Sequence, residues 1–236
     1  MLTEQDLNNG DKSIQVDAKM PTSTTWRGDG NYFCVATMEN EVQTMRVWER
    51  SVSFHSKAEP VEGLGHLFAW KPTGELIAGY QVTPRKTSII FFERNGLQHG
   101  EFDLRDKAVV KDIKWNANSD VLALLLAKED KTVVQLWTTK NYHWYLKQEL
   151  VLSENVTNIT WDPESGHILY LLGDGSLYQF TLAWDVMQSY GREGNENVVA
   201  VIDGAQLYLT AFKRQTVPPP MRTVTIDIST VEPTAK

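Results

Sequence analysis

The chain has 236 residues, of which 42% are hydrophobic and 22% are charged, as is ordinary for a soluble globular protein. Its net charge is −7, and the 23 basic residues are dispersed, which argues against a nucleic-acid surface because such surfaces cluster lysine and arginine. No apolar run approaches the ~18 residues of a membrane-spanning helix, so we expect no membrane contact.

The amino-terminal residues 1–22 are polar and lack the basic start and apolar stretch of a secretory signal. We interpret them as a lead-in or as a strand remnant of a preceding repeat. Cys34 is the only cysteine, so it has no partner for an internal disulfide. Both features favour a reducing intracellular compartment. Because Cys34 lies among apolar residues, we predict a buried structural thiol.

A tryptophan followed by turn residues recurs four times, at spacings of 44, 45 and 46 residues: Trp26, Trp70, Trp115 and Trp161. A second aromatic recurs in phase with the first: Trp48, Phe92, Trp137 and Phe180. Short, β-branched apolar runs lie between them, and a period of roughly 45 residues with such runs is typical of propeller blades. The sequence therefore predicts an all-β fold, a partial WD-repeat-like β-propeller of about four blades plus part of a fifth.

The repeat pattern also predicts the boundaries. Residues 23–184 form four blades, and residues 185–197 lose the apolar pattern and read as a surface loop. Residues 198–221 form an incomplete further blade that ends in a proline-rich crossing, and residues 222–236 start a following strand or a tail. Three dipeptides predict tight hairpin turns: Asn95-Gly96, Asp174-Gly175 and Asp203-Gly204. An open set of blades leaves edge strands exposed, so the chain is either a small ring or a piece of a larger one.

No residue combination in the sequence indicates a catalytic, cofactor or metal site. The five histidines lie far apart, and none has zinc-ligand spacing with a cysteine or carboxylate. Catalytic propellers gather carboxylates in the central funnel, and the candidates here, only by default, are Asp162, Asp112 and Glu75. Roles in turns or ion pairs are favoured for all three. Arg27-Gly28-Asp29 matches an adhesion motif, but its phase places it in a turn. We predict that the protein is not an enzyme, with a propeller hydrolase as the weaker reading.

One aromatic and basic segment, YHWYLK, occupies residues 142–147. If it belongs to the outer strand of a blade, alternation places Tyr142, Trp144 and Leu146 on one face, which we expect to pack between blades. The opposite face carries the candidate partner surface: His143, Tyr145 and Lys147. Base stacking on such aromatics is physically feasible, but the acidic background favours packing or protein contact.

Several long strings resemble, in order and spacing, the first propeller of the largest subunit of the Elongator complex. The most specific is KTVVQLWTTKNYHWYLKQEL (Lys131 to Leu150). Others are TWRGDGNYFCV, EPVEGLGHLFAWKPTGELIA, IIFFERNGLQHGEFDLR, NVVAVIDG and TVPPPM. The resemblance extends from Trp26 to Met221, which is nearly the whole chain.

The resemblance implies a non-catalytic scaffold subunit that supports carboxymethyl-type modification of tRNA wobble uridines. The implied partners are the other Elongator subunits, including the radical-SAM catalytic subunit and the second WD-repeat subunit, with tRNA reached only through the assembled complex. The implied location is the cytoplasm, with the nucleus as a second compartment. Family members continue into a second propeller and a helical-repeat region, which this chain lacks. The alternative is a free-standing propeller adaptor that binds protein or peptide partners.

Overall fold

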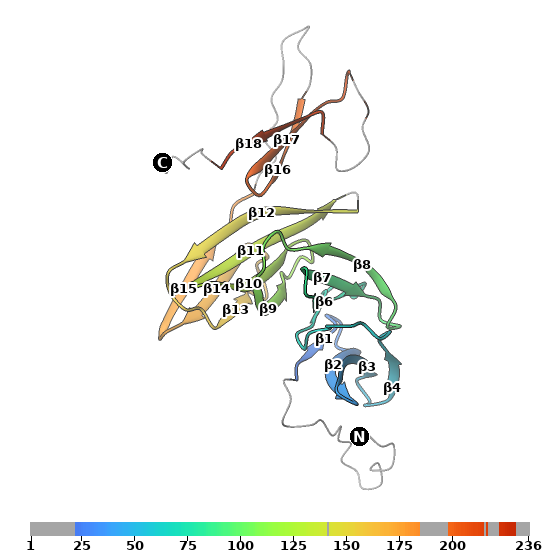
Figure 1. Cartoon of the computed structure of the whole chain (residues 1–236). Helices are drawn as coiled ribbons and strands as arrows, with labels where there is room; N and C mark the ends of the chain where they lie inside the picture. Colours follow the sequence, from blue (N-terminus) through green and yellow to red (C-terminus); the bar gives the residue numbers. More distant parts are fainter. Residues whose placement is uncertain (1–21, 141, 185–197, 215, 217–221, 230–236) are drawn as a thin grey trace, which may run out of the picture.

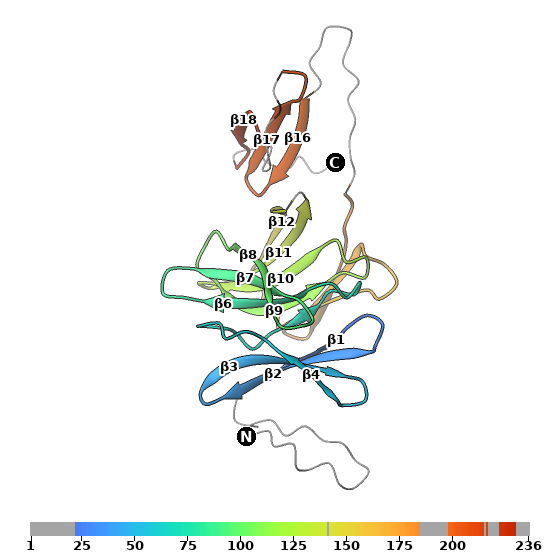
Figure 2. The same ribbon diagram turned by 90° about the vertical axis from the view of Figure 1, so that its right-hand side faces the viewer.

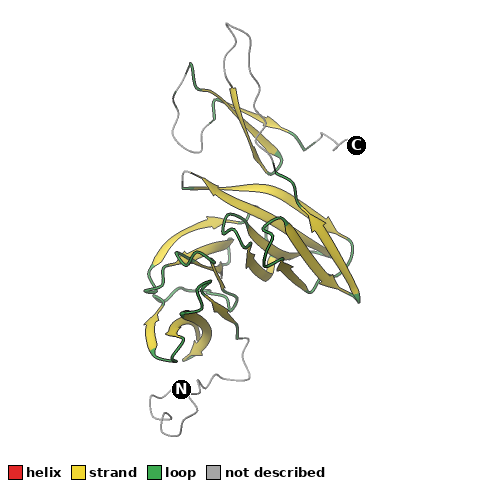
Figure 3. Ribbon diagram, turned by 180° about the vertical axis from the view of Figure 1, so that it is seen from behind, coloured by secondary structure: helices red, strands yellow, loops and turns green. Residues whose placement is uncertain are grey.

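The computed structural model describes residues 22–140, 142–184, 198–214, 216 and 222–229. Within these residues every regular element is a β-strand (Figure 3). None of them belongs to a helix with the length and hydropathy needed to cross a membrane. The predicted lead-in, except for its last residue, the predicted loop at 185–197 and the three prolines of the crossing lie outside the described residues.

Four antiparallel sheets follow one another along the chain (Figure 1). The first contains β1 (Thr24–Trp26), β2 (Tyr32–Glu39), β3 (Val42–Glu49) and β4 (Phe54–Lys57). The second contains β5 (Ala69–Trp70), β6 (Ile77–Val82), β7 (Thr87–Phe92) and β8 (Gln98–Asp103). The third contains β9 (Val109–Trp115), β10 (Leu122–Lys128), β11 (Lys131–Lys140) and β12 (His143–Leu152). The fourth has three described strands, β13 (Asn158–Trp161), β14 (Ile168–Gly173) and β15 (Ser176–Thr181).

The recurring tryptophans each end the first strand of a sheet, and the turn residues that follow lead into the second strand. In the first three sheets, the same backbone hydrogen bond closes this turn, for example from Gly30 N to Arg27 O at 2.8 Å. The residue that donates it has a left-handed backbone in all three cases: Gly30, Gly74 and Ser119, with φ of 68°, 93° and 64°. The repeat in the sequence is therefore a repeat of one strand-turn-strand unit.

Neighbouring sheets pack face to face, and each junction holds its own hydrophobic core. Leu122 to Leu126 in β10 are buried on both faces because the third sheet lies between the second and the fourth. The sheets therefore form an arc, seen from two directions in Figures 1 and 2. This arrangement confirms the predicted all-β, propeller-like fold.

A further sheet consists of β16 (Val198–Asp203), β17 (Gln206–Ala211) and β18 (Val224–Asp227). It includes residues that the sequence pattern assigns to a following strand or tail, because Val224–Asp227 pairs with β17. In Figures 1 and 2 this sheet is set apart from the arc and lies beside β12, which β16 contacts. The sheet thus meets the outer strand of the third sheet, at the segment that carries the predicted partner surface.

Candidate functional site

The predicted segment lies at the β11–β12 hairpin, where Lys140 pairs with His143. Tyr142 is in the turn with φ of 63° and is fully exposed. The alternation pattern assigns Tyr142 to the packed face, and this assignment is wrong because β12 begins only at His143. Strand alternation therefore applies from His143 onward.

Trp144 packs between the second and third sheets, as the alternation predicts. Its ring stacks on Phe91 at 4.8 Å between centroids and on Phe102 at 5.0 Å, and it approaches Trp115 at 6.0 Å. Trp144 is partly buried and borders the core shared by these two sheets. The ring contributes contact area to three aromatic neighbours from β7, β8 and β9.

Tyr145 does not lie on a free surface. Its side chain is only 6% exposed, with the His143 ring at 4.5 Å and the Lys147 ammonium 4.8 Å above its own ring. At this point the turn between β16 and β17 is hydrogen-bonded to Leu146, the next residue of β12, so the candidate partner surface lies beside the last sheet. Burial raises the pKa of the Tyr145 hydroxyl, and nearby Asp203 raises it further.

A β-bulge interrupts β12 directly after this point. Leu136 pairs with Gln148 while Trp137 pairs with Leu146, so Lys147 is an extra residue on the outer strand. The exposed Lys147 donates a hydrogen bond to the Ile202 carbonyl at 2.8 Å. The bulge turns Lys147 toward the β16–β18 sheet, so both Tyr145 and Lys147 contact residues of this chain.

Asp203, at the end of β16, organises the junction. This residue is 4% exposed, and its carboxylate accepts hydrogen bonds from the Leu146 backbone at 2.9 Å, the Tyr208 hydroxyl at 2.9 Å and the Arg105 guanidinium. Arg105 also donates to the Asp203 carbonyl at 3.1 Å. Such charge-assisted bonds to a nearly buried carboxylate are stronger than neutral ones, so they hold the two sheets together.

Gly204 makes this contact sterically feasible. Its φ is 62°, and a Cβ there would lie 2.1 Å from Nη1 of Arg105. The Gly204 amide donates to the Leu146 carbonyl at 2.6 Å, which extends the junction by a backbone bond. Asp203 and Gly204 therefore form the hairpin turn between β16 and β17 and also bind this turn to β12. The sequence pattern predicts only the hairpin turn.

A cavity of about 340 Å³ lies beside the junction, lined by aromatic groups of β8, β11 and β12 and by Asp203 and Tyr208. His143 borders it, and burial lowers the pKa of His143, while Asp203 opposes this shift and Arg222 and Arg105 favour it. Of the groups around the cavity, Arg105 and Asp203 are bonded to each other across the junction. Together with the bonds to Leu146, these bonds fix the position of the β16–β18 sheet against β12.

The three default carboxylates do not converge. Asp112 on β9 lies 3.2 Å from the Lys114 ammonium, and Asp162 accepts hydrogen bonds from two backbone amides of its own turn. Glu75 pairs with Lys71 at 2.7 Å. Each carboxylate belongs to a different sheet and has a partner close to it in the sequence. This arrangement fits the favoured roles in turns and ion pairs.

Cys34 is fully buried in the core between the first and second sheets, and burial raises the pKa of its thiol. This confirms a buried thiol. In the part of the chain that the structure describes, no three His, Cys, Asp or Glu side chains gather as a metal site would require.

Sequence reasoning misses Arg105 and Asp203 as partners. They lie 98 residues apart, and Asp203 is followed by glycine, as in any tight hairpin. The residues around a hairpin turn do not show whether the turn also binds another sheet.

Comparison with known proteins identifies the family. The model described as "ELP1 first N-terminal beta-propeller" matches residues 3–164. Putative elongator complex protein 1 of Xenopus laevis is 42% identical over 221 residues, and Elongator complex protein 1 of Mus musculus is 44% identical over 217. The chain belongs to the Elongator complex protein 1 family. The Saccharomyces cerevisiae member is 39% identical over 220 residues.

These alignments cover 87%, 84% and 84% of the chain but only 19%, 16% and 16% of the Elongator complex protein 1 relatives. The chain thus spans less than one fifth of their length. Solved structures with low identity support the fold alone. The crystal structure of TolB from Acinetobacter baumannii matches with a TM-score of 0.53 at 12% identity, over 84% of this chain and 53% of that one.

Proposed function

We propose that the chain forms part of the first propeller of the scaffold subunit of the Elongator complex and has no catalytic role of its own. The observation that carries this proposal is similarity at 39 to 44% identity to proteins named Elongator complex protein 1, over 84 to 87% of the chain. A fold of sheets packed face to face presents turns and strand edges to partners, which suits a scaffold.

Through the assembled complex, the protein supports carboxymethyl-type modification of wobble uridines in tRNA. Its partners are the radical-SAM catalytic subunit and the second WD-repeat subunit, and it works in the cytoplasm and also in the nucleus. Contact with tRNA occurs only through the complex, a view supported by the net charge of −7 and the dispersed basic residues.

The proposed partner surface now has narrower bounds. Tyr145 is nearly buried, whereas His143 is partly exposed and Lys147 is exposed. These two residues, together with the exposed Tyr142 at the hairpin turn, form the part of the surface that another subunit can reach.

Co-purification tests the proposal. The complete protein encoded by the gene, tagged in its own cells, is expected to recover the radical-SAM subunit and the second WD-repeat subunit. Its removal is expected to abolish carboxymethyl-type wobble uridines. Recovery of neither subunit, with wobble uridines unchanged after removal, would instead support the free-standing adaptor.

A further inference from the structure

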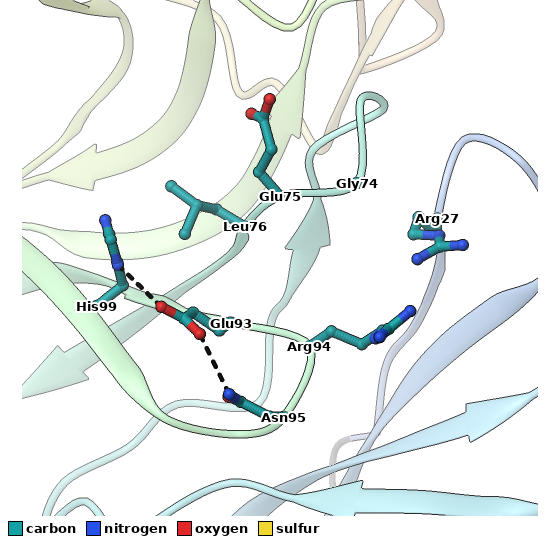
Figure 4. A pocket seen from close by; sticks show the side chains of 8 residues that line it. All are labelled: Arg27, Gly74, Glu75, Leu76, Glu93, Arg94, Asn95 and His99. Atoms are coloured by element: carbon teal, nitrogen blue, oxygen red, sulfur yellow. Dashed lines mark hydrogen bonds and ion pairs between the residues drawn. The ribbon is translucent and has the colours of Figure 1, made fainter.

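A cavity of about 520 Å³ opens between the first and second sheets (Figure 4). Arg27 comes from the turn between β1 and β2, Glu75 from the turn between β5 and β6, and Arg94 from the turn between β7 and β8. Because each residue is set by a tight turn of a packed sheet, the cavity is formed by the propeller framework itself.

Tyr32 brings the two arginines together. The guanidinium carbon of Arg27 lies 4.4 Å from the centroid of the Tyr32 ring, and that of Arg94 lies 4.7 Å from the same centroid. The two guanidinium carbons are therefore at most about 9 Å apart. Figure 4 shows both side chains approaching each other at one end of the cavity.

Both guanidinium groups retain free donors. Arg27 uses Nε and Nη2 to bind the Asp29 carboxylate, with the Nε bond at 2.8 Å, and no acceptor engages its Nη1 within the described residues. Arg94 is exposed, and in the same residues its guanidinium has no carboxylate partner. Within the described residues, Asp29 pairs with Arg27, and no carboxylate pairs with Arg94.

The acids of the cavity do not neutralise these arginines. Glu93 accepts hydrogen bonds from Asn95 at 3.1 Å and lies 3.2 Å from His99, as Figure 4 shows. Glu75 is engaged by Lys71 at 2.7 Å and by the Thr73 hydroxyl at 3.2 Å. Within the described residues, neither acid forms an ion pair with Arg27 or Arg94.

We propose that this cavity binds a phosphorylated side chain of a peptide partner, with the phosphate bridging Arg27 and Arg94. A phosphate offers three acceptor oxygens and nearly two negative charges, so it can engage both guanidinium groups, whereas a carboxylate offers two oxygens and one charge. A nucleic acid fits less well, because two arginines do not form the run of cations that follows a phosphate backbone.

Calorimetric titration of the complete protein encoded by the gene tests this assignment. The probes are capped Gly-Xaa-Gly tripeptides in which Xaa is phosphoserine, glutamate or serine, together with inorganic phosphate as a competitor. The phosphoserine peptide is expected to bind about tenfold tighter than the serine peptide, and phosphate to displace it. A single-stranded oligonucleotide is titrated in the same way. No detectable binding of the phosphoserine peptide, equal affinity for the glutamate peptide, or tighter binding of the oligonucleotide would overturn the proposal.

Three variants locate the binding. Arg94→Gln is expected to weaken phosphopeptide binding about tenfold, whereas Arg85→Gln, which removes the same charge from an exposed turn, leaves it unchanged. Asp29→Asn is expected to tighten phosphopeptide binding, because it removes the carboxylate that pairs with the Arg27 guanidinium. Unchanged affinity in Arg94→Gln, or the same loss in Arg85→Gln, contradicts the site.

Discussion

At the scale of single residues, Trp144 and Tyr145 are neighbours on β12 that stabilise different parts of the molecule. Trp144 stacks against aromatic rings at the junction of the second and third sheets. Tyr145 is nearly buried and precedes Leu146, whose carbonyl accepts a hydrogen bond from Gly204 in the turn that joins β16 and β17. Loss of the first ring therefore weakens the arc, and loss of the second weakens the attachment of the last sheet.

Trp144→Ala is expected to lower the free energy of unfolding of the arc by about 3 kcal/mol, because it removes a ring in contact with three others. Urea denaturation followed by tryptophan fluorescence measures this. Tyr142→Ala, at the exposed turn, serves as the control and is expected to be near neutral. A neutral Trp144→Ala would show that the stacked cluster does not form.

Asp203→Ala is expected to release the β16–β18 sheet while leaving the arc folded. The change removes the acceptor for Arg105, Tyr208 and the Leu146 amide and costs about 2 kcal/mol, less than a fully buried pair because Arg105 is partly exposed. Hydrogen exchange should then become faster in β16–β18 than in β10. Exchange that rises equally in both regions would mean that the two parts unfold as one unit.

At the scale of the elements, the turns after each tryptophan lock one sheet to the next. A Cβ on Gly28 would lie 2.2 Å from the Pro72 carbonyl oxygen, so the first turn packs directly on the second. The Thr73 amide in the second turn donates to the Ser119 hydroxyl in the third at 3.0 Å. The turn geometry that repeats along the chain thus serves packing between sheets as well as chain reversal.

Gly28→Ala is expected to lower the melting temperature, with a cost of about 1 to 3 kcal/mol, because the new methyl group meets rigid backbone. Gly100→Ala is the matched control, since a Cβ there has no atom within 4 Å. Differential scanning calorimetry of both variants compares them directly. Similar melting temperatures for the two would argue against close packing of the first two turns.

Much of this element pattern could be predicted from the sequence. The spacing of Trp26 to Trp161 located the first strand of every sheet in the arc, and the glycines of Asn95-Gly96 and Asp174-Gly175 have the positive φ that hairpins need. The bulge at Lys147 could not be predicted, because a single extra residue leaves no signal in an alternating strand. The position of the last sheet depends on a contact between Arg105 and Asp203, which are distant in sequence.

At the scale of the whole molecule, the arc has two faces that no other sheet covers within the described residues. On the first sheet, the face opposite Cys34 presents Trp26, which is 51% exposed, and Phe54. On the fourth sheet, the face opposite Leu171 presents Leu172 and Leu177, the latter 67% exposed. Apolar faces of this kind on a strand arc favour association with other sheets.

The isolated 236-residue chain is therefore expected to associate or to be poorly soluble. Size-exclusion chromatography with light scattering should give a mass above that of the 26.8 kDa monomer. Replacing Phe54 and Leu177 together by serine should shift the mass toward the monomer, whereas serine at the exposed Val109 of β9 should not. A sharp, compact monomer of the unaltered chain would contradict the expectation.

We propose above that this chain forms part of the first propeller of the Elongator scaffold subunit. A chimera tests this proposal most directly. Residues 22–216 replace the matching segment of the Saccharomyces cerevisiae Elongator complex protein 1, which is 39% identical. The measurement is the fraction of tRNA carrying carboxymethyl-type wobble uridine, determined by mass spectrometry of nucleosides. The account predicts that the chimera retains the modification while a strain lacking the segment loses it. A chimera that is expressed at the normal level but leaves wobble uridine unmodified would contradict the account.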